Sequence, residues 1–151
     1  MRRREFIAVL RSVAAWPVAV AGLLRAAGAQ QPSRVRRVGV LMNLAVDDWL
    51  GQTFRAVFAQ GMQQFCWDVG GNVLIDYRWG TGDTDQYRKY AAELVALGPD
   101  VIVATAASIV RDLQQVSRTV PIVFVTTIDP VGSGLVTSLA RPGGNATGFA
   151  A

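Results

Sequence analysis

Two short runs of apolar residues, 101–104 (VIVA) and 121–125 (PIVFV), constrain the fold of this chain more than any other feature. Each run is shorter than a typical helix, and neither carries a polar side chain that could face water. Strands of this kind occur in parallel sheets whose two faces are both covered by helices. The chain is therefore predicted to contain the central strands of an α/β protein.

The segments around these two runs alternate between strand and helix patterns. Residues 35–42 form a third β-rich apolar run, and residues 73–79 alternate apolar with polar side chains, as a half-exposed edge strand does. A fifth strand is predicted from residue 146. Helices are predicted after Asp47 or Asp48, after Asp83, over residues 107–118 and over residues 130–140.

Short connections between alternating strands and helices predict a doubly wound parallel sheet of about five strands, with right-handed crossovers and the order 2-1-3-4-5. In such a sheet, ligands bind beyond the carboxyl ends of the strands where the order reverses. That point lies here between the first and third strands. The candidate ligand positions that follow from topology alone are Asn43, Leu44, residues 105–108 and residues 126–129.

The first predicted helix carries an apolar stripe that we expect to pack against the sheet. Its members are Leu50, Phe54, Val57, Phe58, Met62 and Phe65. Trp49, just before the stripe, either packs with these side chains or covers a ligand. Cys66, the only cysteine, cannot form an internal disulfide and is expected to be a small buried apolar side chain.

The chain's first 29 residues have the pattern of a cleavable signal peptide. Residues 2–4 are arginines, residues 12–24 are apolar, and residues 27–29 are Ala-Gly-Ala, which predicts cleavage between Ala29 and Gln30. The apolar run is shorter than the roughly 20 residues that a membrane-spanning helix needs. Residues 30–151 are therefore the expected mature domain, exported to the periplasm.

The export route has two interpretations. Residues 3–7, Arg-Arg-Glu-Phe-Ile, are similar to a twin-arginine signal, and an ordinary Sec signal with a basic start remains the alternative. The net charge of +4 belongs entirely to this leader, since residues 30–151 carry ten basic and ten acidic side chains. The mature domain therefore lacks the positive excess that binding to nucleic acid requires.

The residue types of the chain favour binding of a solute without reaction, and no cofactor or metal is expected. There is no histidine, and the glycines at 80–82 and 132–134 lack the spacing of phosphate-binding loops. The polar groups at the predicted strand ends are hydroxyls, amides and one carboxylate, Asp129. Asp129 precedes Pro130, so it either caps a helix or binds the ammonium group of a solute. Exposed helix N-termini would then hold the carboxylate.

Three stretches carry a family likeness: residues 72–82 (NVLIDYRWGTG), 90–103 (YAAELVALGPDVIV) and 119–148 (TVPIVFVTTIDPVGSGLVTSLARPGGNATG). They resemble the ABC transporter substrate-binding protein family that includes tryptophan- and tyrosine-type uptake receptors. The resemblance implies a type I periplasmic-binding fold, capture of a small organic solute between two lobes without catalysis, and delivery to an ABC permease in the inner membrane.

By that resemblance, the residues facing the cleft from the first lobe are Asn43, Thr105, Ala106, Thr126 and Asp129. An amino acid is the candidate solute. Two features depart from the family pattern. Cys66 stands where family members commonly have glycine, and family chains are about twice as long, so residues 30–151 are expected to be a first lobe without the second, as in a truncated gene product.

Two other functions remain as alternatives. One is a flavodoxin-like or hydrolase-like enzyme that uses Asp129 or Asp100 as an acid or base, against which the lack of histidine counts. The other is a remnant that binds nothing.

Overall fold

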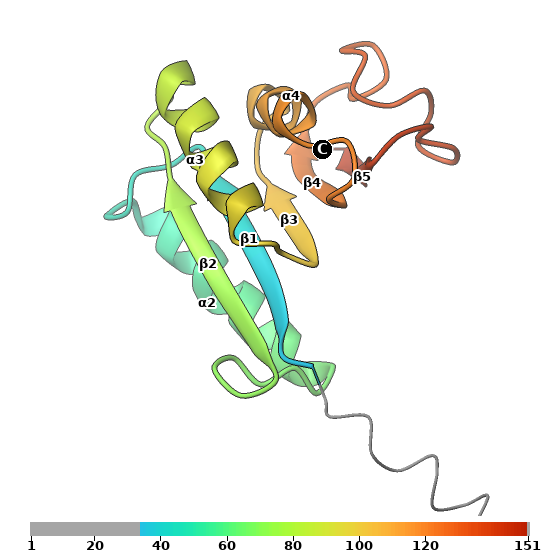
Figure 1. Ribbon diagram of the computed structural model, residues 1–151. Helices are drawn as coiled ribbons and strands as arrows, with labels where there is room; N and C mark the ends of the chain where they lie inside the picture. Colours follow the sequence, from blue (N-terminus) through green and yellow to red (C-terminus); the bar gives the residue numbers. More distant parts are fainter. Residues whose placement is uncertain (1–33, 151) are drawn as a thin grey trace, which may run out of the picture. The chain divides into compact units, whose positions relative to one another are not determined.

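The computed structural model describes residues 34–150, which contain a five-stranded parallel sheet flanked by helices (Figure 1). The strands are β1 (Arg36–Met42), β2 (Val73–Trp79), β3 (Val101–Ala104), β4 (Ile122–Thr127) and β5 (Ala146–Ala150). Their order is β2-β1-β3-β4-β5 with every neighbouring pair parallel, which confirms the predicted fold class and strand order. The leader and its cleavage site at Ala29 and Gln30 lie outside the described residues.

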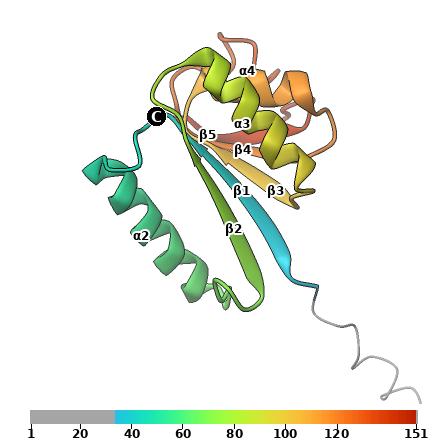
Figure 2. The same ribbon diagram turned by 60° about the vertical axis from the view of Figure 1, so that its left-hand side comes forward.

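The helices cover the two faces of the sheet unequally (Figure 2). Helix α2 (Trp49–Gln64) lies on one face beside β1 and β2, while α3 (Thr84–Ala96) and α4 (Ala107–Val116) lie on the other. Within β3, Ile102 packs into the core under α3 and α4, while Val103 belongs to the core on the α2 side. Burial on both faces explains why the β3 run contains no polar residue.

Two of the three helices within residues 34–150 begin at an aspartate that caps them. Oδ1 of Asp48 accepts a hydrogen bond from Leu50 N at 2.8 Å, and Oδ1 of Asp83 accepts one from Asp85 N at 2.9 Å. These side chains satisfy N–H groups that lack a partner within the first turn of a helix. The predicted helix starts are therefore confirmed, with Asp48 rather than Asp47 as the first cap.

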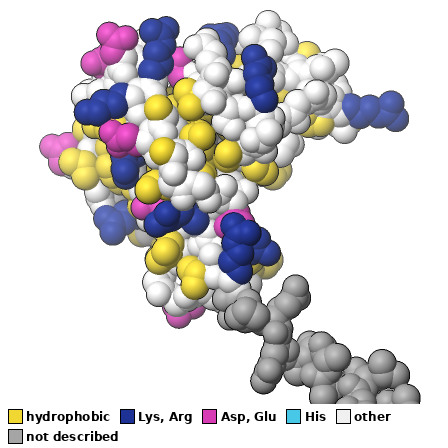
Figure 3. Space-filling model, in the orientation of Figure 1, with side chains coloured by type: hydrophobic (Ala, Val, Ile, Leu, Met, Phe, Trp, Pro, Cys, Tyr) yellow, Lys and Arg dark blue, Asp and Glu magenta, His cyan; other side chains and the backbone are white. Residues whose placement is uncertain are grey.

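Charged side chains of both signs are interspersed on the surface seen in Figure 3. Several form pairs between elements, such as Arg36 with Asp100 at 2.9 Å and Arg78 with Glu93 at 2.9 Å. Such exposed pairs each contribute about 1 kcal/mol or less. Among residues 34–150, no helix combines the length and apolarity needed to cross a membrane.

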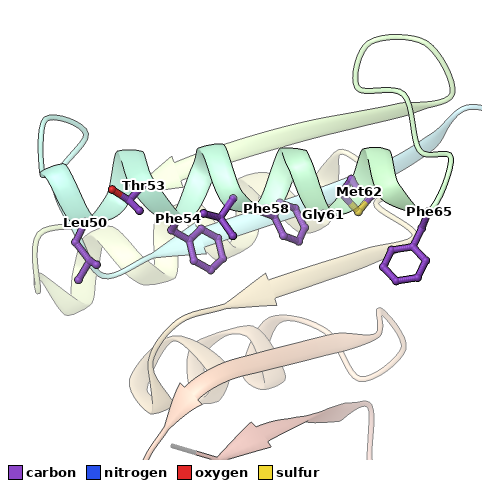
Figure 4. Close-up of a pocket in the computed structure, with 8 residues that line it drawn as sticks. Leu50, Thr53, Phe54, Phe58, Gly61, Met62 and Phe65 are labelled. Atoms are coloured by element: carbon purple, nitrogen blue, oxygen red, sulfur yellow. The ribbon is translucent and has the colours of Figure 1, made fainter.

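The expected apolar stripe on α2 is only partly buried. Phe54, Phe58 and Met62 pack against the sheet, but Val57 is 61% exposed and Phe65 is 78% exposed. The reason is that α2 lies toward the β1–β2 end of the sheet, so one flank of the helix meets no element within residues 34–150. An open groove of about 560 Å³ runs along that flank (Figure 4).

Aromatic side chains join α2 to the edge strand β2. A Cβ atom added at Gly51 would lie 2.7 Å from the Trp79 ring, so the glycine allows close approach of helix and strand. The rings of Trp79 and Tyr77 stack with centroids 5.8 Å apart, and the Arg55 guanidinium lies 5.5 Å from the Tyr77 centroid. Burial raises the pKa of Tyr77 above its ordinary value, and the positive charge of Arg55 partly opposes that rise.

The predicted helix over residues 130–140 is wrong, because this segment consists of turns. Gly134 has a φ of 72°, and Leu135 N donates to the carbonyl of Pro130 at 3.0 Å, which closes a single turn. A glycine in the left-handed region ends a helix rather than continuing it. The chain then buries Leu135 and Val136 in the core under α3 and α4.

Cys66 was expected to be buried and is exposed. It has a φ of 62° and follows the end of α2, where Cys66 N donates to Gln63 O and Trp67 N donates to Met62 O. These two bonds form a Schellman motif, in which the residue at the position of Cys66 is left-handed and usually glycine. The side chain therefore points away from the core because the backbone turns there.

Replacing Cys66 with glycine is expected to raise the free energy of unfolding by about 1 kcal/mol, because glycine adopts the left-handed conformation without the clash of a Cβ atom. Urea denaturation followed by circular dichroism would measure the change. Cys66→Ala removes the same thiol but keeps the Cβ, so it should leave stability unchanged. Equal stability of the two variants would contradict a backbone origin.

Candidate functional site

Polar side chains lie at the carboxyl ends of three neighbouring strands, at one edge of the sheet. Asn43 comes directly after β1, Thr105 directly after β3, and Thr126 lies near the end of β4. Because the strands are parallel, their carboxyl ends meet at the same edge. The junction between β1 and β3 is the point where the strand order reverses, as predicted.

Hydrogen bonds join these three residues into one cluster. The Thr105 hydroxyl donates to Oδ1 of Asn43 at 2.8 Å and accepts from the Asn43 backbone N–H at 3.1 Å. The Thr126 hydroxyl donates to the Thr105 carbonyl at 3.3 Å. Thr105 is 9% exposed, whereas Asn43 and Thr126 are exposed. We call Asn43, Thr105 and Thr126 the strand-end cluster.

The backbone of Thr126 is strained. Its φ is 56°, a left-handed value that is unfavourable for a residue branched at Cβ. The pairing of β4 with β5 shifts register between Phe124 and Thr127, so the strain coincides with an irregularity in the strand. Strained residues gather at binding and catalytic sites, where the surrounding structure holds them. Nothing in the residue pattern of 122–127 predicts this feature, since consecutive threonines are ordinary in strands.

Asp129 acts as a cap, as one of its two interpretations predicted. Its Oδ1 accepts a hydrogen bond from Gly132 N at 2.8 Å, and its carbonyl accepts from the backbone N–H and the hydroxyl of Ser133. The element it caps is the turn after Pro130 rather than a helix. No hydrogen bond within residues 34–150 joins Asp129 to the strand-end cluster, although its side chain is exposed near the end of β4.

Helix α4 has no side-chain cap. Its N-cap position is Ala106, a half-buried residue whose methyl group cannot accept a hydrogen bond, immediately after Thr105 in the cluster. The N–H groups of its first turn therefore remain available to another acceptor, and the helix dipole gives this end a partial positive charge. Ala106 is one of the five residues predicted to face a cleft. Its side chain offers no polar group, and it matters because it leaves the start of α4 uncapped.

Large apolar side chains are exposed at the same edge of the sheet. Trp49, after the β1 loop, is 76% exposed, so it is not packed into the protein. Ile128, after β4, is 80% exposed, and Phe149, near the end of β5, is 73% exposed. Exposed apolar side chains around polar groups are typical of surfaces that contact a ligand or another protein domain.

Asp100, the other carboxylate considered for acid or base chemistry, lies at the opposite edge. Its Oδ2 accepts from the Arg37 backbone N–H at 2.9 Å, and its Oδ1 pairs with Arg36 at 2.9 Å. It precedes β3, whereas Asp129 follows β4. Since the strands are parallel, the two carboxylates lie at opposite ends of the strands. They therefore cannot act on one reacting group.

The groove along α2 in Figure 4 is separate from the strand-end cluster and has different chemistry. Its one polar side chain is Thr53, whose hydroxyl already donates to the Trp49 carbonyl at 2.8 Å. A specific solute site needs polar groups that fix orientation. Within residues 34–150, no three His, Cys, Asp or Glu side chains are grouped as metal ligands would be.

Comparison with known proteins gives a consistent family. Residues 46–151 match the family model described as "ABC transporter substrate binding protein". A tyrosine-binding protein of Clostridioides difficile is 29% identical over 91 residues, which is 60% of this chain and 26% of that protein.

Solved structures resemble about three quarters of the chain. A conserved domain protein from Vibrio cholerae superposes with a TM-score of 0.71 and 29% identity, covering 78% of this chain and 39% of that one. An ABC domain from Streptococcus pneumoniae in complex with L-Trp superposes with a TM-score of 0.67 and 27% identity, covering 76% and 38%. The chain thus spans less than half the length of these similar proteins.

Substitutions at Asp129 separate its role as a cap from any contact with a ligand. Asp129→Ala is expected to lower the free energy of unfolding by about 1 kcal/mol, because the Gly132 N–H loses its acceptor. Asp129→Asn keeps a side-chain oxygen that can accept the same bond, so its stability should stay close to that of the original chain. Thermal and urea unfolding would measure both. Equal losses in the two variants would contradict the capping role.

Proposed function

Because this chain belongs to the family of ABC transporter substrate binding proteins, we propose that it binds an amino acid at the strand-end cluster without chemical change. The observation that carries the proposal is the hydrogen-bonded set of polar side chains from three adjacent strand ends, at the point where the strand order reverses. Polar groups held in this way can orient a small solute.

The edge offers groups of both kinds that an amino acid requires. The uncapped N-terminus of α4, beside Thr105, suits a carboxylate because its N–H groups and dipole both favour negative charge. The exposed Thr126 hydroxyl and the Asp129 carboxylate suit an ammonium group. Neither partner would need to lose or gain a proton, so the interaction is binding and not catalysis.

An aromatic side chain on the solute is the favoured choice. Trp49, Ile128 and Phe149 are exposed at this edge and could cover an aromatic ring. Two relatives support the same class, since one structure is a complex with L-Trp and one curated protein is named for tyrosine. We therefore propose L-tryptophan or L-tyrosine as the first candidates.

Membership of the family supports a role in transport as well. Residues 1–29 would direct export and be removed between Ala29 and Gln30, and residues 30–151 would act in the periplasm as the first lobe of a receptor that delivers its solute to an ABC permease. The matched structures are more than twice as long as the matched part of this chain. A second lobe would supply further contacts, so residues 30–151 alone should bind more weakly than a two-lobed receptor.

Titration of residues 30–151 with L-tryptophan and L-tyrosine, by calorimetry and by NMR chemical shifts, tests the proposal. Binding should weaken about tenfold or more for tryptamine, which lacks the carboxylate, and for indole-3-propionate, which lacks the ammonium group, because a charged hydrogen bond is lost in each case. Asp129→Asn should weaken L-tryptophan and leave indole-3-propionate unaffected.

A folded protein that gives neither heat nor shift changes with any amino acid would contradict binding by this domain. Turnover of an added substrate that disappears in Asp129→Asn would instead favour the enzyme alternative.

A further inference from the structure

We infer that Thr105 is a positioning residue, whose hydroxyl holds the Asn43 side chain so that the amide N–H groups, and not the amide oxygen, face the solute. The inference rests on the proposed function and specifies which group of the solute Asn43 recognises. It differs from the expectation that Thr105 itself contacts the solute.

The two hydrogen bonds of the Thr105 hydroxyl determine which atom it donates to and which atom it accepts from. A threonine hydroxyl has one proton to donate and lone pairs with which to accept. Its oxygen accepts from the Asn43 backbone N–H at 3.1 Å, and its proton goes to Asn43 Oδ1 at 2.8 Å. Both bonds involve the same residue, so the hydroxyl closes a ring that fixes the Asn43 side chain relative to its own backbone.

Thr105 is itself held in place by the sheet. Its backbone N–H donates to the Leu41 carbonyl at 3.3 Å, and its carbonyl accepts from the Thr126 hydroxyl at 3.3 Å. The residue is 9% exposed, and branching at Cβ restricts its side chain to few rotamers. The proton of the Thr105 hydroxyl is therefore committed to Asn43 and cannot be donated to a solute.

This arrangement of hydrogen bonds would orient a bound amino acid. With Oδ1 turned toward the Thr105 hydroxyl, exposed Asn43 offers the two N–H groups of Nδ2, which have no hydrogen-bond partner among residues 34–150. They require an acceptor such as a carboxylate. The Thr126 proton is already used on Thr105, so its oxygen offers lone pairs to a donor such as ammonium. An amino acid would thus lie with its carboxylate toward β1 and its ammonium group toward β4.

Two substitutions isolate the hydroxyl. Thr105→Val keeps the shape of the side chain and removes the hydroxyl, whereas Thr105→Ser keeps the hydroxyl. Thr105→Val should weaken binding of L-tryptophan about tenfold and leave tryptamine unchanged, because only the carboxylate contact depends on Asn43. Thr105→Ser should restore L-tryptophan binding. Thr119→Val makes the same change before β4, at the opposite ends of the strands from the cluster, and should alter neither affinity.

An NMR measurement without solute tests the positioning directly. The side-chain amide signals of Asn43, assigned by their loss in Asn43→Ser, should report a rigid group in the original chain and in Thr105→Ser, and a mobile one in Thr105→Val. Urea unfolding of each variant confirms that the protein remains folded.

Binding of an amino acid by the domain and positioning of Asn43 by Thr105 can fail independently. If the original chain binds no amino acid, the proposed function fails, while the amide signals still decide whether Thr105 holds Asn43. An Asn43 amide that stays rigid in folded Thr105→Val would overturn the inference. Equal weakening of L-tryptophan and tryptamine would overturn it as well, since a general disturbance of the site would then explain the loss.

Discussion

The pairing of β1 with β2 on one side and β3 on the other is the constraint on which the rest of this structure depends. It makes β1 fully interior, so that Val40 and Leu41 are buried on opposite faces under α2 and under α3. It also sends the connections after β1 and β3 to opposite faces of the sheet, which separates the chain beyond Asn43 from the chain beyond Thr105 and opens the edge between them.

The polar atoms at that edge differ in whether the protein already supplies their hydrogen-bond partners, and this difference decides which of them can bind a solute. Two aspartates are used to cap α2 and α3, whereas α4 starts at an alanine and keeps its first N–H groups available. The hydroxyls of Thr105 and Thr126 donate their protons inward to protein oxygens. The groups left facing outward are hydrogen-bond donors near β1 and acceptors near β4, which are complementary to the carboxylate and the ammonium group of an α-amino acid.

Features that repeat along the chain could be predicted from the sequence, and features of single backbone positions could not. The apolar runs at β3 and β4 and the aspartates before α2 and α3 gave the strand order and two helix starts, because burial and capping act on residue type. Cys66 and Thr126 adopt left-handed conformations that their side chains disfavour, and tertiary packing imposes these. The turn after Pro130 differs from the predicted helix because left-handed Gly134 ends the helical turn before the apolar residues that follow it.

The one-sided attachment of α2 has a consequence for the dynamics of the protein. This helix is joined to the sheet through Gly51, the Tyr77–Trp79 stack and a few half-buried side chains, while α3 and α4 share a fully buried core with β3 and β4. Segments with few buried contacts open at lower free energy than the whole domain. Amide protons of α2 should therefore exchange with solvent before those of α4, so the β1 loop beside the strand-end cluster borders a unit that opens more readily than the α3–α4 side of the sheet.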